Sequence, residues 1–197
     1  MSMRILAALP IVLLLGSGSA LAEGPDFVGV KKCKSCHGKE KMGDQYSVWK
    51  ASVHAKAFET LGTEKAKKWA AERGLGDPQT EDDCLRCHVT AHGVPDERLG
   101  SSFVRTEGVQ CESCHGAGQD YRKKKIMADR ERAISKGLVP QSEKVCVVCH
   151  NDESPAWDLA RYKLGNGETA GFDYEQAVEE IAHPVPDDYD AFGGASD

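Results

Sequence analysis

Eight cysteines constrain this chain more than any other feature, because they form four pairs with two residues between the members of each pair. A histidine follows immediately in all four cases. The residues are Cys33, Cys36 and His37; Cys84, Cys87 and His88; Cys111, Cys114 and His115; and Cys146, Cys149 and His150. Disulfides and zinc sites also use cysteine pairs, but neither needs a histidine directly after every pair. Cys-x-x-Cys-His is the attachment signature of a c-type haem.

The chemistry of haem attachment explains the spacing. Two thiols add to the two vinyl groups at one edge of the porphyrin, and the adjacent histidine is then held under the ring as an axial iron ligand. The four motifs therefore predict four haem c groups. Aromatic residues make up only 7% of the chain, and four large apolar cofactors would supply much of the core that is otherwise missing.

Three histidines lie outside the motifs, and we expect all three to be distal iron ligands. His54 lies beside an apolar stripe at helical spacing, which would point its ring inward. His92 comes four residues after His88, too close to reach the far side of its own haem, so it would serve a neighbouring one. His183 follows an expected helix and precedes a proline.

The histidine count then leaves one iron short of a ligand, because seven histidines serve four irons. Three haems would have two histidine ligands, and the fourth would be open or take another group. The alternatives are Met42, Met127, a lysine or water. We predict no catalytic residue.

The N-terminus has the features of a signal peptide. Arg4 precedes an apolar run over residues 5–15, and small residues at 20–22 suit cleavage after Ala22. We therefore expect an exported, periplasmic protein with a single domain over residues 23–197 and a flexible acidic tail from about residue 187. No second apolar run follows that could span a membrane.

The charge of the chain limits its partners. Its net charge is −6, which argues against nucleic acid, since binding there depends on basic residues that neutralise phosphates. An acidic surface instead suits a basic redox protein. Donor and acceptor proteins are expected, and association with a membrane electron-transfer complex is possible through soluble contacts.

The local patterns predict a mainly α fold of short helices and loops around the haems, with little or no sheet. Helices are expected over residues 44–61, 63–73 and 122–136. Further helix starts are expected from a capping box of Thr80 with Asp83, from Ser142, and from Asp173 with Gln176.

Several phrases of the sequence resemble the tetrahaem cytochrome c-554 family. They are Trp49-x-x-Ser52-x-His54, Cys87-His88-Val89-Thr90, the stretch from Gly108 to Gly118, Cys149-His150-Asn151-x-x-Ser154-Pro155, and Ile181-Ala182-His183-Pro184. The resemblance implies a mostly helical electron relay with closely paired haems, three with two histidine ligands and one open. Tyr121 is a departure, since many similar chains have histidine there, and we expect it to pack on a porphyrin edge.

Three functions fit these features. The first is an electron carrier, because two histidine ligands leave an iron no position for substrate. The second is a redox enzyme that acts on hydroxylamine, nitric oxide, nitrite or a sulfur oxyanion at the open haem. The third is a subunit of a larger assembly. No motif replaces its histidine with lysine, the mark of ammonia-forming nitrite reductases, and the carrier is favoured over the enzyme.

Overall fold

The structure is a computed structural model that describes residues 24–154 and 157–185. The expected signal peptide, residues 1–22, and the expected acidic tail from residue 187 lie outside the described residues. All four Cys-x-x-Cys-His motifs and all seven histidines lie inside them.

The described chain is mainly helical, which confirms the predicted fold class. Its α-helices are α1 (Val30–His37), α2 (Gln45–Ala51), α3 (Ala57–Leu61), α4 (Glu64–Ala71), α5 (Asp82–His88), α6 (Cys111–His115), α7 (Lys124–Met127), α8 (Arg130–Ser135), α9 (Glu143–Cys146) and α10 (Tyr174–Ile181). Three 3-10 turns are η1 (Glu40–Met42), η2 (Asp96–Arg98) and η3 (Arg105–Glu107). One antiparallel hairpin pairs β1 (Tyr162–Lys163) with β2 (Thr169–Ala170).

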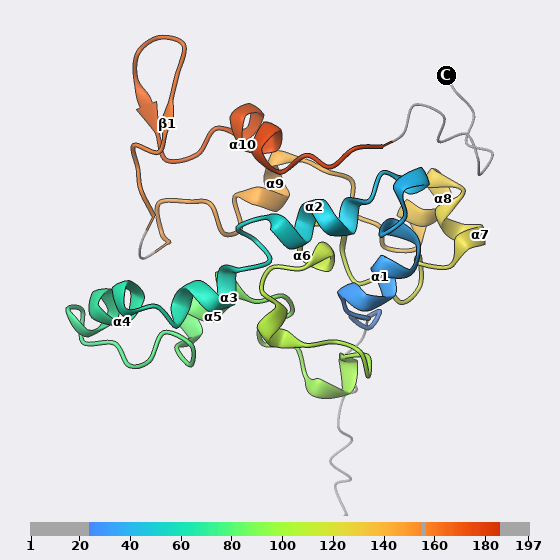
Figure 1. The fold of residues 1–197 in the computed structure, drawn as a ribbon, viewed down its shortest axis with the longest axis horizontal. Coiled ribbons are helices and arrows are strands. Elements are labelled where there is room, and N and C mark those ends of the chain that lie inside the picture. The colour runs from blue at the N-terminus through green and yellow to red at the C-terminus, as the bar shows by residue number, and fades with distance from the viewer. Residues whose placement is uncertain (1–23, 155–156, 186–197) are drawn as a thin grey trace, which may run out of the picture.

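The helices lie along an elongated body (Figure 1). Helices α3, α4 and α5 occupy one end, α1, α7 and α8 occupy the other, and α2 and α6 lie between them. The hairpin, α9 and α10 run along one side. No described helix is long and apolar enough to cross a membrane.

The prediction of one helix over residues 44–61 was wrong. Helix α2 ends at Ala51, and a turn over residues 52–56 separates it from α3. Ser52 ends the helix, because its hydroxyl donates to the carbonyl of Trp49 at 2.7 Å, a local bond that competes with the helical ladder. The carbonyl of His54 accepts the backbone N–H of Val109 at 2.9 Å, so a distant segment fixes the turn.

Two other helix boundaries also differ from the expectation. The helix expected over residues 122–136 is split into α7 and α8, because the Asp129 carboxylate accepts the N–H of Arg132 at 2.9 Å and caps a new start. The capping box of Thr80 with Asp83 was also wrong, since α5 begins at Asp82 and has no side-chain cap.

Other cap predictions were confirmed. The Asp173 side chain accepts the N–H of Gln176 at 3.0 Å at the start of α10. The helix expected from residue 63 is present as α4, with the Thr63 hydroxyl accepting the N–H of Ala66. Ser142 precedes α9 as predicted but forms no side-chain cap bond there.

The side chains of the described residues form only a small buried core. The largest fully buried side chains of the described residues are Gln110, Val30 and Thr90, two of which are polar. Buried aliphatic and aromatic residues are scattered over the elements instead of forming one apolar layer. The small number of large buried apolar side chains among the described residues is consistent with a fold that encloses large apolar cofactors.

Candidate haem-binding site

Three of the four cysteine motifs form the end of a short helix, and the fourth begins where a helix ends. Helices α1, α5 and α6 contain the first three motifs and end at His37, His88 and His115, while α9 ends at Cys146 and a turn leads to His150. A helical turn brings the two cysteines of a motif to neighbouring positions on one face. All eight cysteines are free thiols, so the donor groups that haem attachment needs are available.

The fold gathers the four motifs into two groups. The Cys111 thiol lies close enough to that of Cys33 to be the main cause of its raised pKa, and α1 contacts α6, so motifs 1 and 3 lie together. The Cys149 thiol likewise lies close to that of Cys87 and is the main cause that lowers the pKa of Cys87 to about 6. Motifs 2 and 4 therefore form the second group, so each group joins motifs that are not consecutive in the sequence.

One carboxylate joins motif 3 to the segment that leads into motif 1. Glu112 is only 2% exposed. Its Oε1 accepts the backbone N–H groups of Val28 at 2.8 Å and Gly118 at 2.7 Å, and its Oε2 accepts that of Gly29 at 2.8 Å. These three bonds satisfy the carboxylate and three buried backbone donors at once, and they fix α1 against α6.

Two histidines outside the motifs lie opposite motif histidines. The ring centroids of His54 and His150 are 5.9 Å apart, and those of His115 and His183 are 6.1 Å apart. Two imidazoles that bind one metal ion from opposite sides, each through a bond of about 2 Å, have centroids about 6 Å apart. Both separations fit an iron between the rings.

The electrostatic setting keeps these imidazoles neutral. Burial, with the neighbouring His183 and His37, lowers the pKa of His115 to about 4. Burial, with His54 and Arg161, likewise lowers the pKa of His150 to about 4. Burial also lowers the pKa of His54 and His183. A neutral imidazole is the form that binds a metal ion, so the donor set suits haem iron.

Known proteins provide an independent comparison. The family model described as "Cytochrome c554 and c-prime" matches residues 32–116. "Cytochrome c-554" of Nitrosomonas europaea is 34% identical over 180 residues, which cover 81% of this chain and 74% of that protein.

The chain belongs to the cytochrome c-554 family. It is therefore a c-type cytochrome that binds haem c and transfers electrons to and from redox protein partners. No solved structure matches it.

Within this c-554-family chain, the histidines of motifs 1 and 2 each have a hydrogen-bond partner at Nδ1. The Nδ1 of His88 lies 2.7 Å from the Ala57 carbonyl oxygen, which can only accept, so Nδ1 carries the proton. The Nδ1 of His37 lies 3.2 Å from Oε1 of Gln45. Such contacts orient a ligating imidazole and leave the other ring nitrogen, Nε2, for the metal.

Gln45 also connects motif 1 to the segment that contains His183. Its Nε2 donates to the Pro184 carbonyl at 2.8 Å and to the carbonyl of Met42. The Gln45 side chain is almost fully buried. One amide group therefore contacts both the histidine of motif 1 and the residue directly after His183, a candidate distal ligand.

His92 has a different environment from His54 and His183. Its Nε2 lies 3.4 Å from Oδ1 of Asp82 at the start of α5. Its ring also borders a cavity of about 480 Å³ whose lining includes Phe58, Leu85 and Arg105. His92 is thus beside motif 2 and not opposite a motif histidine, and its role as a distal ligand stays a prediction.

Tyr121 lies six residues after His115 and is buried. Its hydroxyl donates to the Gly116 carbonyl at 2.9 Å. Burial, with the nearby Cys33, Glu112 and Cys111, raises the pKa of Tyr121, so the phenol is neutral. It lies near the thiols of motifs 1 and 3, and its packing on a porphyrin edge stays a prediction.

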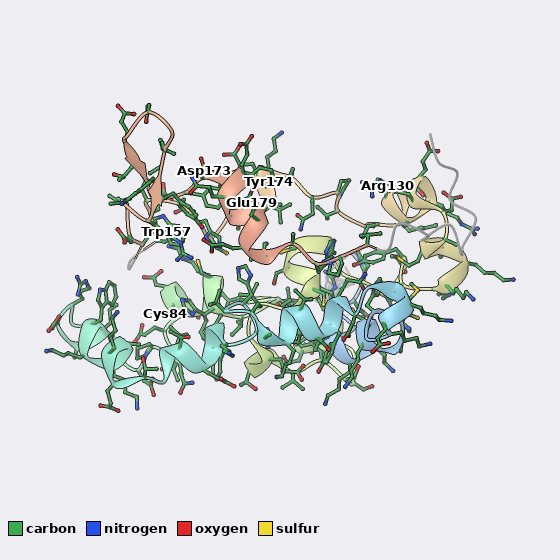
Figure 2. All side chains as sticks on the ribbon, turned by 45° about the horizontal axis from the view of Figure 1, so that its top comes forward. Cys84, Arg130, Trp157, Asp173, Tyr174 and Glu179 are labelled. Carbon is green, nitrogen blue, oxygen red and sulfur yellow. The ribbon has the colours of Figure 1, made fainter. Side chains whose placement is uncertain are left out.

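Several residues that build the site were not predicted. Glu112 and Gln45 are polar residues with no sequence pattern of their own. The Trp157 ring lies 4.7 Å from that of His150, and the Phe172 ring 5.4 Å from it. An aromatic residue downstream of a motif is the only signal that could have indicated these contacts. Figure 2 shows Trp157 and Cys84 toward the same end of the molecule.

Proposed function

We propose that this cytochrome relays electrons through four haem c groups, one attached to each Cys-x-x-Cys-His motif. The mature protein is a single domain over residues 23–197, exported to the periplasm after cleavage at Ala22. Bound haem supplies a one-electron Fe(II)/Fe(III) couple, and the side chains attach, orient and surround it.

The observation that carries this proposal is the pair of opposed imidazoles. His54 is the distal partner of His150, and His183 is the distal partner of His115. Centroid separations of 5.9 and 6.1 Å support both assignments. An iron with two histidine ligands has no vacant position for substrate, so it serves electron transfer.

The grouping of the motifs supports a relay. Contacts between the thiols of Cys33 and Cys111 and between those of Cys87 and Cys149 favour two close haem pairs. Burial is the main cause of the raised pKa of the Cys114 thiol, and the nearby Cys146 thiol raises it further. This third contact links the two pairs, so that electrons can pass between them without leaving the protein.

The third distal ligand is proposed to be His92, which leaves one iron open or bound by a non-histidine group. For this ligation, His92 would have to exchange its contact with Asp82 for an iron. The variant His92→Ala decides the point by electron paramagnetic resonance. Ligation predicts that one low-spin signal becomes high-spin, and an unchanged spectrum contradicts it.

Proximity of a cavity to motif 2 supports a second candidate function, reduction or oxidation of a small nitrogen or sulfur compound at an open haem. The cavity of about 480 Å³ presents His92 and Arg105 beside Leu85, which lies within the motif. Stopped-flow mixing of the reduced holoprotein with hydroxylamine, nitric oxide or nitrite tests it. Rapid multiple turnovers favour the enzyme, and slow or absent oxidation favours the carrier.

The main experiment on the carrier function is a redox titration of the purified holoprotein. Four electrons taken up per chain, with reversible absorbance changes typical of low-spin haem, support the relay. Fewer electrons, or irreversible bleaching, contradict it. Association with a membrane complex is a further proposal, tested by co-purification of the cytochrome with detergent-solubilised membrane proteins.

A further inference from the structure

Positive charge collects at one end of this acidic protein. Residues 30–44 contain five lysines against two carboxylates, and residues 120–136 contain seven basic residues against three acidic ones. The whole chain nevertheless has a net charge of −6. The remaining residues are therefore strongly acidic, and the charge distribution is markedly uneven.

The two basic segments are neighbours in the fold. The backbone N–H of Gln119 donates to the Asp26 carbonyl at 3.2 Å, and Glu112 joins residues 28 and 29 to residue 118. Both views show α1, α7 and α8 at the same end of the molecule, with Arg130 far from Cys84 in Figure 2. We call residues 31–41 and 122–136 together the basic end.

Five exposed lysines of the basic end have no carboxylate partner among the described residues. Side chains of Lys31, Lys32, Lys39, Lys123 and Lys125 are exposed, and none forms an ion pair with another residue in the described ranges. Two lysines at the other end of the molecule, by contrast, do have carboxylate partners. In α4, Lys67 lies 3.6 Å from Glu64 and Lys68 lies 4.0 Å from Glu72.

A redox centre lies within the basic end. Motif 1 is part of α1, and Cys36, one of its two attachment thiols, is exposed. Electrostatic interactions are screened over about 8 Å at physiological ionic strength. An approaching protein therefore responds to the local positive surface more than to the net charge of the chain.

We propose that the basic end is the docking surface for a negatively charged electron-transfer protein, which exchanges electrons with the haem of motif 1. This inference rests on the proposed relay function. It adds the sign of the partner's charge and the haem at which electrons enter the relay. Complementary charge would steer the encounter and orient motif 1 toward the partner. The reaction moves one electron from partner to ferric haem, with no proton or group transferred.

Reduced plant-type [2Fe–2S] ferredoxin, an acidic one-electron donor, serves as the probe. Its second-order rate constant with the ferric holoprotein is measured by stopped flow at several ionic strengths. We expect the rate constant to fall as salt is added, despite the negative net charge of both proteins. The double variant Lys123→Glu/Lys125→Glu should react about ten-fold more slowly at low ionic strength.

The matched control is Lys65→Glu/Lys68→Glu in α4, which changes the net charge by the same amount at the opposite end. It should alter the rate constant less than two-fold. Equal slowing in both double variants would mean that only net charge matters, and it would overturn the proposal. A rate constant that rises with salt would overturn it as well.

A neutral donor separates failure of this inference from failure of the relay. Photoreduced neutral flavin should reduce all three proteins at the same rate. If flavin reduces them but ferredoxin shows no preference for the basic end, the docking proposal is wrong and the relay stands. If neither donor reduces the haems, the relay itself is wrong.

Discussion

Replacement of Glu112 provides a quantitative check on how the fold brings motifs 1 and 3 together. In the native protein this buried carboxylate accepts three backbone N–H groups at 2.7–2.8 Å. Glu112→Ala would leave all three donors buried without a partner, at about 1–3 kcal/mol each. The alanine variant no longer has to bury a charged carboxylate, and this gain offsets part of the cost. We therefore expect a net loss of about 3–6 kcal/mol in the free energy of unfolding.

The size of this loss is large against the total stability of a domain, about 5–15 kcal/mol. Glu112→Gln keeps the shape and one acceptor oxygen but directs an NH₂ group at a backbone donor. It should therefore lose less than the alanine variant, about 1–3 kcal/mol. Both changes leave Cys111 and Cys114 in place, so haem attachment can proceed.

Chemical denaturation of the holoprotein, followed by far-ultraviolet circular dichroism, measures these differences. Glu131→Ala is the control, because Glu131 is an exposed glutamate in α8, and it should change the free energy of unfolding by less than about 0.5 kcal/mol. A loss below about 1 kcal/mol for Glu112→Ala would refute the reasoning. In that case the contact between the motifs would not depend on this carboxylate.

Three further predictions concern single residues of the site. His54→Ala and His183→Ala should each convert one low-spin haem to high-spin, seen by electron paramagnetic resonance. A spectrum identical to that of the parent protein would remove the altered histidine from the ligand set. Gln45→Leu deletes the acceptor beside Nδ1 of His37, which makes that ligand less basic. One midpoint potential should rise by up to about 60 mV in a spectroelectrochemical titration, and no shift would rule out a tuning role. Gly108→Ala should lower the midpoint of thermal unfolding. Gly108 has φ +76°, and an added Cβ would lie 2.6 Å from the His54 carbonyl oxygen. An unchanged midpoint would show that stability does not depend on this close approach.

The sequence was most informative where the chemistry is local. A motif of five consecutive residues specifies haem attachment by itself, and the Asp173 cap was predictable because its partner is three residues away. The break at residues 52–56 was not predictable in this way. It depends on a bond from His54 to Val109, a residue 55 positions later, and an apolar stripe at helical spacing continues across it.

The ligand partners illustrate the same limit. Counting histidines indicates how many irons can have two imidazole ligands, but not which histidine faces which motif. The fold brings His54 to motif 4, the last in the chain, and His183 to motif 3. Glu112 and Gln110 hold the segment before motif 1 near motif 3, and Gln45 holds Pro184 near motif 1. Long-range bonds of this kind leave no periodic signal in the sequence.

The intact mass of the secreted holoprotein, measured under denaturing conditions, tests the central claim most directly. Covalently attached groups remain on the chain when it unfolds, whereas dissociable cofactors are lost. The account predicts the mass of residues 23–197 plus four haems. A mass with fewer haems, or one two hydrogens lower for each cysteine pair joined as a disulfide, would contradict it.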